Sequence, residues 1–383
     1  AFLLTQTFGA VTEKNNFPEC KYSYSDKLQN STHSYSLEKL QQITGDKYEL
    51  RFSLFSQYKM VPVAPEPGTW TNGVSIFRKR STNEYVLAVA GTNFKGMSSY
   101  LMEDSNICGV GQQGFSGLKS YSDVNPENKE EAARRARIWY GTYLGLHEIQ
   151  TASGQIVGSS VEKTLLEFMS SEEGCSTTSK CSLTVAGHSL GATLTPGLAL
   201  LVDDKIGNFQ VESVQLFAAP APGTSTFADY YNGRLGDVTT TLRNSKDVVP
   251  LCNQGPLMKS SLMSLWDTPK NQCGDNSVLP PVDGIQTMFK LFISQHWRCG
   301  SLLSSEPAIS DGTHVQASST TSFDAHVQPV DVNGSLVIAC PSTVSWAGQE
   351  AAYQHVTAYF NYLFNDSGRA YTTFHGGAPQ NEL

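Results

Sequence analysis

The stretch SLTVAGHSLGATLTPGLALLVDD, residues 182–204, constrains the fold of this chain more than any other. Residues 182–186 are typical of a buried strand. After Ser189, leucines recur with the period of a helix, at positions 190, 194, 198 and 201. Between the two runs stands the pattern Gly-x-Ser-x-Gly, whose small residues let a strand and a helix pack closely around a strained turn. The stretch therefore predicts a strand, a sharp turn and a helix, with Ser189 raised as a nucleophile. The alternative is an ordinary glycine-rich bend.

Other runs extend this unit to an α/β fold. Residues 211–219 and 238–245 are short, β-branched runs separated by helical stretches, which is typical of a mostly parallel sheet flanked by helices. The β-rich runs 74–78 and 85–90 flank a polar turn, as in a hairpin.

Further helices are expected along the chain. One begins after Asn125, with an apolar stripe between positions 132 and 143. A second covers residues 160–170. The last follows His355, with a stripe formed by Val356, Tyr359, Phe360 and Leu363.

The length of 383 residues suits one large α/β domain. We predict a single domain over residues 1–383, with residues 1–70 as a wrapping segment. Residues 253–340 are rich in Ser, Gly, Pro and Asp and hold three cysteines. They break the strand–helix rhythm and predict a loop-rich insertion or cap.

Charge and cysteine content limit the possible partners and compartments. The net charge of −8 leaves no basic stripe for nucleic acid, and no apolar run reaches the length of a membrane span. The first ten residues lack the basic start of a signal peptide, so we interpret Ala1 as a mature N-terminus. No CxxC pair is present, and we expect neither a metal nor a cofactor.

Eight scattered cysteines suit disulfides in an oxidising compartment; eight free thiols are the alternative. Short loops favour the pairs Cys175–Cys181 and Cys252–Cys273. Glycosylation sequons begin at Asn30, Asn333 and Asn365. The chain is therefore expected to be a secreted, extracellular glycoprotein.

The partners of Ser189 are sought in the order acid, then histidine, which this turn geometry requires. Asp247 directly follows a strand-like run and precedes Val-Val-Pro, which stops a helix and shapes a loop. Asp203, Asp204 and Asp229 fall on predicted helices instead. Asp247 is therefore the predicted acid.

Five histidines follow Asp247 in the sequence: His296, His314, His326, His355 and His375. His355 directly precedes the last amphipathic stretch, which would anchor it against the sheet, so it is the predicted base. His296 stays the alternative.

Together these residues resemble the class 3 lipases, the fungal-type family of α/β-hydrolases. The matching segments are, in order, YVLAVAGTN, GQQGFSGLKSY, LTVAGHSLGATL, LFAAPAPGTSTFADYYN, NSKDVVPL and HVTAYF. The resemblance implies a catalytic triad of Ser189, Asp247 and His355. It also implies an oxyanion hole formed by Thr92 and the backbone N–H of Leu190.

The resemblance further implies a lid over residues 94–104, whose apolar side chains could meet a lipid surface; a permanently buried helix is the alternative. Three features depart from the family. Ala90 stands where an arginine is common, and Gly or Gln replaces the histidine ahead of the Gly-Phe segment. The acid and the base are 108 residues apart in the sequence, because residues 253–340 lie between them.

By this resemblance the chain is expected to hydrolyse carboxylic esters of acylglycerols at an oil–water or membrane interface, with no obligate protein partner. A phospholipase A-type enzyme or a feruloyl-type carbohydrate esterase with the same triad is the alternative within this chemistry. A catalytically degenerate member that binds lipid or protein is the alternative from another class.

Overall fold

A computed structural model describes part of the chain. The described residues are 2–5, 40–42, 44–56, 72–91, 113–114, 136–175, 180–223, 225–245, 247, 249–251, 320–323, 354–355 and 358–364. The chain divides into two compact units, and each is described by itself. The first unit comprises residues 1–241 and 315–320, and the second comprises residues 242–314 and 321–383. The prediction of a single domain stays a prediction.

The first unit is built on a mixed sheet. Its strands are β1 (Tyr48–Ser56), β2 (Asn72–Lys79), β3 (Glu84–Val89), β6 (Ser153–Ile156), β7 (Glu162–Thr164), β8 (Cys181–His188), β9 (Phe209–Phe217) and the start of β10 (Thr239–Asn244). They are ordered β10-β9-β8-β3-β2-β1-β6-β7. The hairpin predicted around residues 74–90 is confirmed as the antiparallel pair β2–β3.

The directions of the strands divide this sheet. β3, β8 and β9 run parallel, and the prediction of parallel neighbours is confirmed for β8 and β9. β1, β2, β6 and β7 join them through antiparallel pairs. The sheet is therefore parallel at its centre and antiparallel towards β7, rather than mostly parallel. Short turns join β2 to β3 and β6 to β7, which suits antiparallel neighbours, whereas a parallel pair needs a long crossover.

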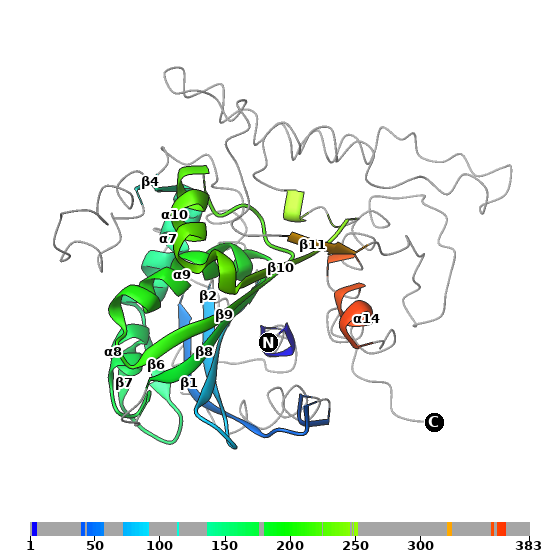
Figure 1. Cartoon of the computed structure of the whole chain (residues 1–383). Helices are drawn as coiled ribbons and strands as arrows, with labels where there is room; N and C mark the ends of the chain where they lie inside the picture. Colours follow the sequence, from blue (N-terminus) through cyan, green and yellow to red (C-terminus); the bar gives the residue numbers. More distant parts are fainter. Residues whose placement is uncertain are drawn as a thin grey trace, which may run out of the picture. The chain divides into compact units, whose positions relative to one another are not determined.

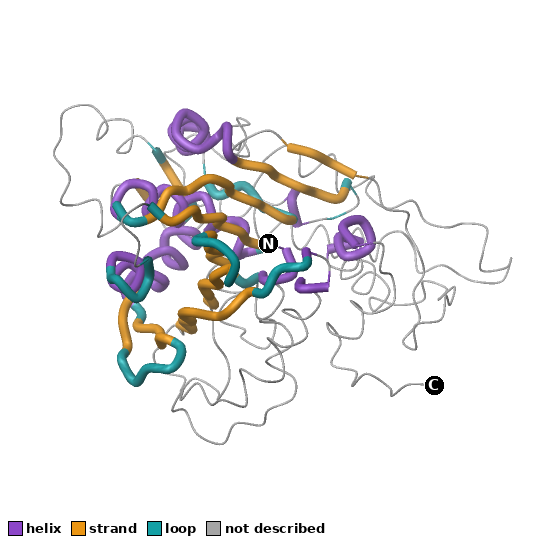
Figure 2. The backbone as a smooth tube through the Cα atoms, turned by 60° about the horizontal axis from the view of Figure 1, so that its bottom comes forward, coloured by secondary structure: helices purple, strands orange, loops and turns teal. Residues whose placement is uncertain are grey.

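The helices of the first unit are α1 (Phe2–Thr5), α7 (Tyr140–Thr151), α8 (Leu165–Ser170), α9 (Leu190–Lys205) and α10 (Ser225–Leu235), with a 3₁₀ turn η5 at Gly236–Val238. In Figures 1 and 2, α7 and α9 lie on one side of the sheet, and α1 lies on the other side against β8 and β3. Residues 190–202 of α9 are all buried, because this helix packs between β8, β9, α7 and α10. The helix predicted after Ser189 is confirmed.

The helix predicted after Asn125 does not run unbroken through its apolar stripe. Residues Arg137–Ile138 form a short strand, β5, which pairs with β4 (Gln113–Gly114), and Ile138 also bridges to Gly223. The helix α7 begins only at Tyr140. Backbone pairing with distant segments overrides the local helical period here.

The helix predicted over residues 160–170 is shorter than expected. Residues Glu162–Thr164 form β7, and α8 begins at Leu165. Thr164 and Glu167 form a capping box: the Thr164 side chain accepts from the Glu167 N–H, and the Glu167 carboxylate accepts from the Thr164 N–H. This signal, Thr-x-x-Glu, was present in the sequence and marks the start of the helix.

The predicted disulfide Cys175–Cys181 is confirmed. It closes a short loop between α8 and the first residue of β8, and both of its half-cystines are buried in the core. Cys252 and Cys273 lie outside the described residues, as do the sequon residues Asn30, Asn333 and Asn365.

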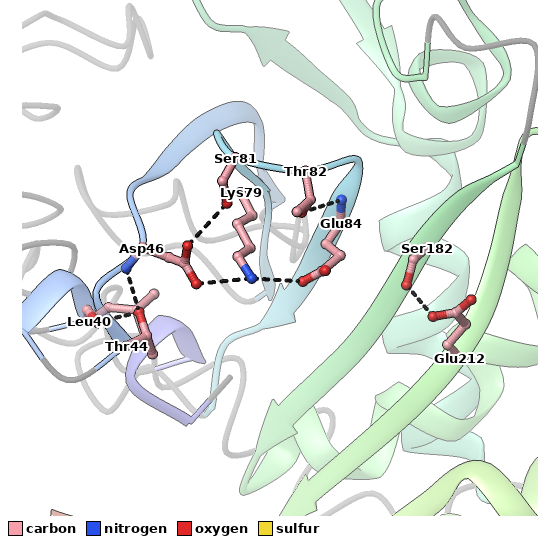
Figure 3. A network of polar contacts seen from close by, with 9 residues as sticks. All are labelled: Leu40, Thr44, Asp46, Lys79, Ser81, Thr82, Glu84, Ser182 and Glu212. Carbon is pink, nitrogen blue, oxygen red and sulfur yellow. Dashed lines mark hydrogen bonds and ion pairs between the residues drawn. The ribbon is translucent and has the colours of Figure 1, made fainter.

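The edge of the sheet at which β3 and β8 begin carries a polar network (Figure 3). The Lys79 Nζ atom lies 2.9 Å from an Asp46 oxygen and 3.3 Å from a Glu84 oxygen. Ser81 donates a hydrogen bond to Asp46, and Ser182 of β8 donates to Glu212 of β9. These contacts tie strand ends and turns together, and the strained residues described below lie at the opposite edge.

The second unit contains the end of β10 and most of β11 (Thr320–Phe323), which are neighbours in the sheet order. It also contains a 3₁₀ turn η6 (Val249–Leu251), a wide helical turn at Gln354 and His355, and the helix α14 (Ala358–Phe364). Apart from residues 320–323, the predicted insertion 253–340 lies outside the described residues, and so does the predicted lid 94–104. Within the described ranges, none of the helices is long and apolar enough to cross a bilayer.

Candidate active site

Ser189 occupies a strained backbone conformation between β8 and α9. Its φ is 59° and its ψ is −128°, a combination that residues with a side chain rarely adopt. The register pairs Val89 with Gly187, and His188 with Phe217. Ser189 therefore lies at the edge where the parallel strands β3, β8 and β9 end, which is where open α/β sheets place their ligands.

The two glycines that flank Ser189 make this turn possible. A β-carbon on Gly187 would lie 2.3 Å from Thr195 Oγ1 and 2.4 Å from the Gly191 carbonyl oxygen. A β-carbon on Gly191 would lie 2.3 Å from the carbonyl oxygen of Ala90. The pattern Gly-x-Ser-x-Gly is thus explained by the close approach of β8, α9 and the end of β3.

Gly91 brings the end of β3 against the serine itself. A β-carbon on Gly91 would lie 3.2 Å from the Ser189 β-carbon and 3.1 Å from the His188 carbonyl oxygen. Any larger residue at position 91 would press on Ser189. Thr92, the predicted oxyanion residue, follows directly and lies outside the described residues.

The turn is held from the other side by β9. The Ser189 N–H donates to the Phe217 carbonyl oxygen at 3.0 Å. Ala218, the next residue, has a φ of 54°, so the chain turns sharply as it leaves β9. Ser189 and Ala218 are the two non-glycine residues with positive φ in the described part of the chain. Both lie at the same edge of the sheet.

Leu190 is the first residue of α9. The first N–H groups of a helix have no acceptor within the helix, and they carry its positive partial charge. The Leu190 N–H, the second predicted oxyanion donor, therefore stands next to Ser189 at a helix end suited to a developing negative charge.

In the second unit, the predicted acid and base form a direct contact. The His355 Nδ1 atom lies 2.8 Å from Asp247 Oδ2, and both side chains are buried. The other carboxylate oxygen, Oδ1, accepts the Val249 N–H at 3.0 Å. Asp247 can thus orient the imidazole, as an acid does in a Ser-His-Asp triad. Their roles in a reaction stay predictions.

Tyr359 is a further neighbour of the acid that the sequence did not reveal. Its hydroxyl donates to Asp247 Oδ2 at 3.1 Å, and its side chain is fully buried. Burial, and next the negative charge of Asp247, raise the pKa of Tyr359 well above that of an ordinary phenol. The sequence shows Tyr359 only as part of the apolar stripe after His355, and a buried hydroxyl in that stripe must find a partner.

The rejected acids occupy other positions. Asp203 and Asp204 lie on α9 and pair with Arg234 of α10. Asp229 lies on α10. The alternative base His296 lies outside the described residues, as do His314, His326 and His375.

Comparison with known proteins gives one family match. Residues 115–254 match the family described as Lipase (class 3). This range includes β8, Ser189 and Asp247. No curated protein sequence matches the chain.

Among solved structures, the fold is similar to that of M37 lipase. The TM-score is 0.64 at 20% sequence identity, over 97% of this chain and 94% of that chain. Structures of the nonglycosylated LIP2 lipase of Yarrowia lipolytica (TM-score 0.40, 11% identity, 65% of this chain and 71% of that chain) and of lipase II of Rhizopus niveus (TM-score 0.35, 12% identity, 64% and 72%) are also similar. The likeness to M37 lipase supports an α/β-hydrolase fold for this chain.

Proposed function

Since residues 115–254 of the chain belong to the class 3 lipase family, we propose that the protein is a secreted triacylglycerol lipase. It would cleave carboxylic esters of acylglycerols through a covalent acyl-enzyme. The observation that carries this proposal is the strained conformation of Ser189 between β8 and α9. A serine hydroxyl needs to be held clear of the backbone before it can serve as a nucleophile.

In the proposed acylation step, the Ser189 hydroxyl attacks the ester carbonyl carbon. His355 takes the serine proton on Nε2, while Asp247 holds the proton on Nδ1 and stabilises the imidazolium. The contact of 2.8 Å between His355 and Asp247 supports this division of roles. His355 then protonates the departing alcohol.

The negative charge on the tetrahedral intermediate needs donors that are already in place. We assign these donors to the Leu190 N–H, at the start of α9, and to Thr92. Water, activated by His355, then attacks the acyl-enzyme and releases the fatty acid. The residues in these steps require neither a metal nor a cofactor.

Secretion is supported by the buried disulfide Cys175–Cys181, because disulfides persist mainly in oxidising compartments. An extracellular lipase meets its substrate as droplets or membranes, so the substrate side of the reaction is expected to be a lipid interface.

The proposal is tested with Ser189→Ala and its matched control Ser182→Ala. Ser182 lies near the start of β8, at the edge of the sheet opposite to Ser189, where it donates to Glu212. We expect wild type and Ser182→Ala to hydrolyse soluble p-nitrophenyl esters and to bind an organophosphonate covalently. We expect Ser189→Ala to do neither. Full esterase activity in Ser189→Ala would refute the proposal, and a wild type that takes up no label would point to a degenerate member.

The base is tested by the pair His355→Ala and His296→Ala. Loss of activity in the first with activity kept in the second supports His355. The reverse result would move the base to His296.

The substrate class is tested by a panel of esters. We expect the rate on emulsified long-chain triacylglycerol to exceed the rates on phospholipid and on feruloyl esters, and to rise once the substrate passes its solubility limit. A higher rate on phospholipid or on feruloyl esters would replace the lipase assignment with one of those two enzymes.

A further inference from the structure

Asn244, the last residue of β10, connects the segment that carries the acid to the segment that carries the base. Its side-chain Nδ2 atom lies 2.9 Å from the Gln354 backbone oxygen and 2.6 Å from Gln354 Oε1. Gln354 directly precedes His355, and Asn244 stands three residues before Asp247. The side chains of Asn244 and Gln354 are both buried, with 1% and 0% of their surface exposed.

The orientation of both amides follows from the backbone atom in the contact. A backbone carbonyl oxygen only accepts hydrogen bonds, so the Asn244 atom that faces it must be the nitrogen. The second Nδ2 hydrogen then needs an acceptor, which Oε1 of Gln354 provides. The side-chain amide of Asn244 thus donates hydrogen bonds both to the backbone and to the side chain of Gln354.

The backbone of Asn244 makes the remaining contacts of this network. Its N–H donates to the Tyr359 hydroxyl at 2.8 Å, and its carbonyl oxygen accepts the Asp247 N–H at 3.1 Å. Because the Tyr359 oxygen accepts from Asn244, its own proton is directed to Asp247 Oδ2. Asn244 therefore contacts Asp247, Gln354 and Tyr359.

The Asp247 hydrogen bond fixes one atom of the imidazole, Nδ1. Asp247 and His355 are 108 residues apart in the sequence, so the direction of the ring also depends on how the backbone before His355 is held. The contact between Asn244 and Gln354 is a second point of attachment, at the residue next to His355. Errors of about 1 Å in the placement of a catalytic group cost about 100-fold in rate.

We propose that Asn244 is a positioning residue that, through Gln354, holds the His355 segment in register with Asp247. This inference rests on the proposed function, because it assigns a role to a residue that supports the same acid–base pair. Asn244 takes no direct part in the steps of the proposed reaction. Its effect on the rate passes through His355.

The test compares Asn244→Ala and Gln354→Met with the control Gln150→Met. Asn244→Ala removes both side-chain contacts. Gln354→Met keeps about the same volume and the backbone contact, and it replaces the side-chain amide, so that Asn244 Nδ2 loses its Oε1 acceptor. Gln150 is a second buried glutamine, whose Nε2 donates to the Leu146 carbonyl oxygen within α7. It lies outside the proposed catalytic machinery.

We expect kcat on a soluble ester to fall about 10- to 100-fold in Asn244→Ala and about 3- to 10-fold in Gln354→Met, with KM changed less than twofold. Gln150→Met should keep the wild-type kcat. If Asn244→Ala fails to fold, the near-isosteric Gln354→Met still tests the positioning role. A wild-type kcat in folded Gln354→Met, measured well below its Tm, would overturn the proposal and leave the pair a purely structural role.

A second readout separates this proposal from the proposed function. The His355 Nδ1 proton, held by buried Asp247, is expected to give a downfield proton NMR resonance that Asp247→Asn removes. We expect this resonance to broaden or disappear in Gln354→Met and to persist in Gln150→Met. An unchanged resonance in Gln354→Met refutes the positioning role even if the protein hydrolyses no ester. A wild type that shows the resonance but lacks esterase activity refutes the proposed function alone.

Discussion

His355 Nδ1 lies 2.8 Å from Asp247 Oδ2, although 108 residues of sequence separate the two residues. Both side chains are buried, and the carboxylate accepts further hydrogen bonds from Val249 and Tyr359. A buried carboxylate is stable only when its oxygens are paired. This contact orients the His355 imidazole, and the local sequence pattern around either residue does not define where the imidazole lies.

Replacing Asp247 with Asn should remove most of the activity without unfolding the protein. The amide keeps the shape of the carboxylate but no longer selects the imidazole tautomer that has its proton on Nδ1. In a Ser-His-Asp triad this change lowers kcat about 10⁴-fold. Steady-state rates on a soluble ester and the near-UV circular dichroism spectrum check the prediction. Asp229→Asn on α10 is the control, and a similar loss in that variant would contradict a specific role for Asp247.

Replacing Gly187 with Ala should destabilise the first unit. The new β-carbon would lie 2.4 Å from the Gly191 carbonyl oxygen, which belongs to the backbone and cannot move aside cheaply. Overpacking of this kind costs about 1–3 kcal/mol of unfolding free energy. Gly207→Ala is the matched control, because nothing lies within 4 Å of a β-carbon there. Urea unfolding should give a lower unfolding free energy for Gly187→Ala than for Gly207→Ala. Equal stabilities would show that the turn at Ser189 can widen.

The buried tyrosines should make the protein lose stability at alkaline pH. Burial raises the pKa of both Tyr359 and Tyr231, so each keeps its proton in the folded state at a pH where the unfolded chain has lost it. The stability is therefore intact below about pH 10, the usual tyrosine pKa, and falls as the pH rises above it, by up to about 1.4 kcal/mol per pH unit for each residue.

Tyr359→Phe and Tyr231→Phe should each make this alkaline loss less steep. The free energy of unfolding between pH 9.5 and 11.5 is the quantity to measure. Tyr362→Phe is the control, since the Tyr362 side chain is 54% exposed. A slope that is the same in all three variants and in the wild type would show that other groups govern the alkaline transition.

Removing the disulfide with the double variant Cys175→Ala and Cys181→Ala should lower the unfolding free energy by about 2 kcal/mol. The bond closes a loop with a sequence separation of only 6, so the gain from restricting the unfolded chain is modest. Denaturant unfolding of wild type and variant gives the difference. Thiol counting by mass spectrometry after alkylation supplies the control, because the unreduced wild type should leave Cys175 and Cys181 unmodified. Alkylation of either cysteine in that sample would contradict the bond.

Local patterns in the sequence determined the parts of the fold whose partners are close along the chain. The elbow at Ser189 follows from an apolar run, small residues and a helical period within about twenty residues. The β2–β3 hairpin and the Cys175–Cys181 bond also join neighbours. Asp247 could be proposed because a strand and a Pro-containing loop flank it directly. In each case the interacting groups are held together by short chain segments, so local periodicity and turn chemistry suffice.

Only the tertiary structure decided the features that depend on distant segments. Arg137–Ile138 became strand β5 because Gln113–Gly114 lies beside it, against a helical pattern in its own sequence. The sequence shows Tyr359 only as one apolar position in a stripe, whereas in the structure its hydroxyl donates to Asp247. Asn244 and Gln354 carry no motif at all, and they meet across 110 residues. Buried polar groups must be paired in three dimensions, and a sequence shows which groups need a partner without showing which one folding brings to them.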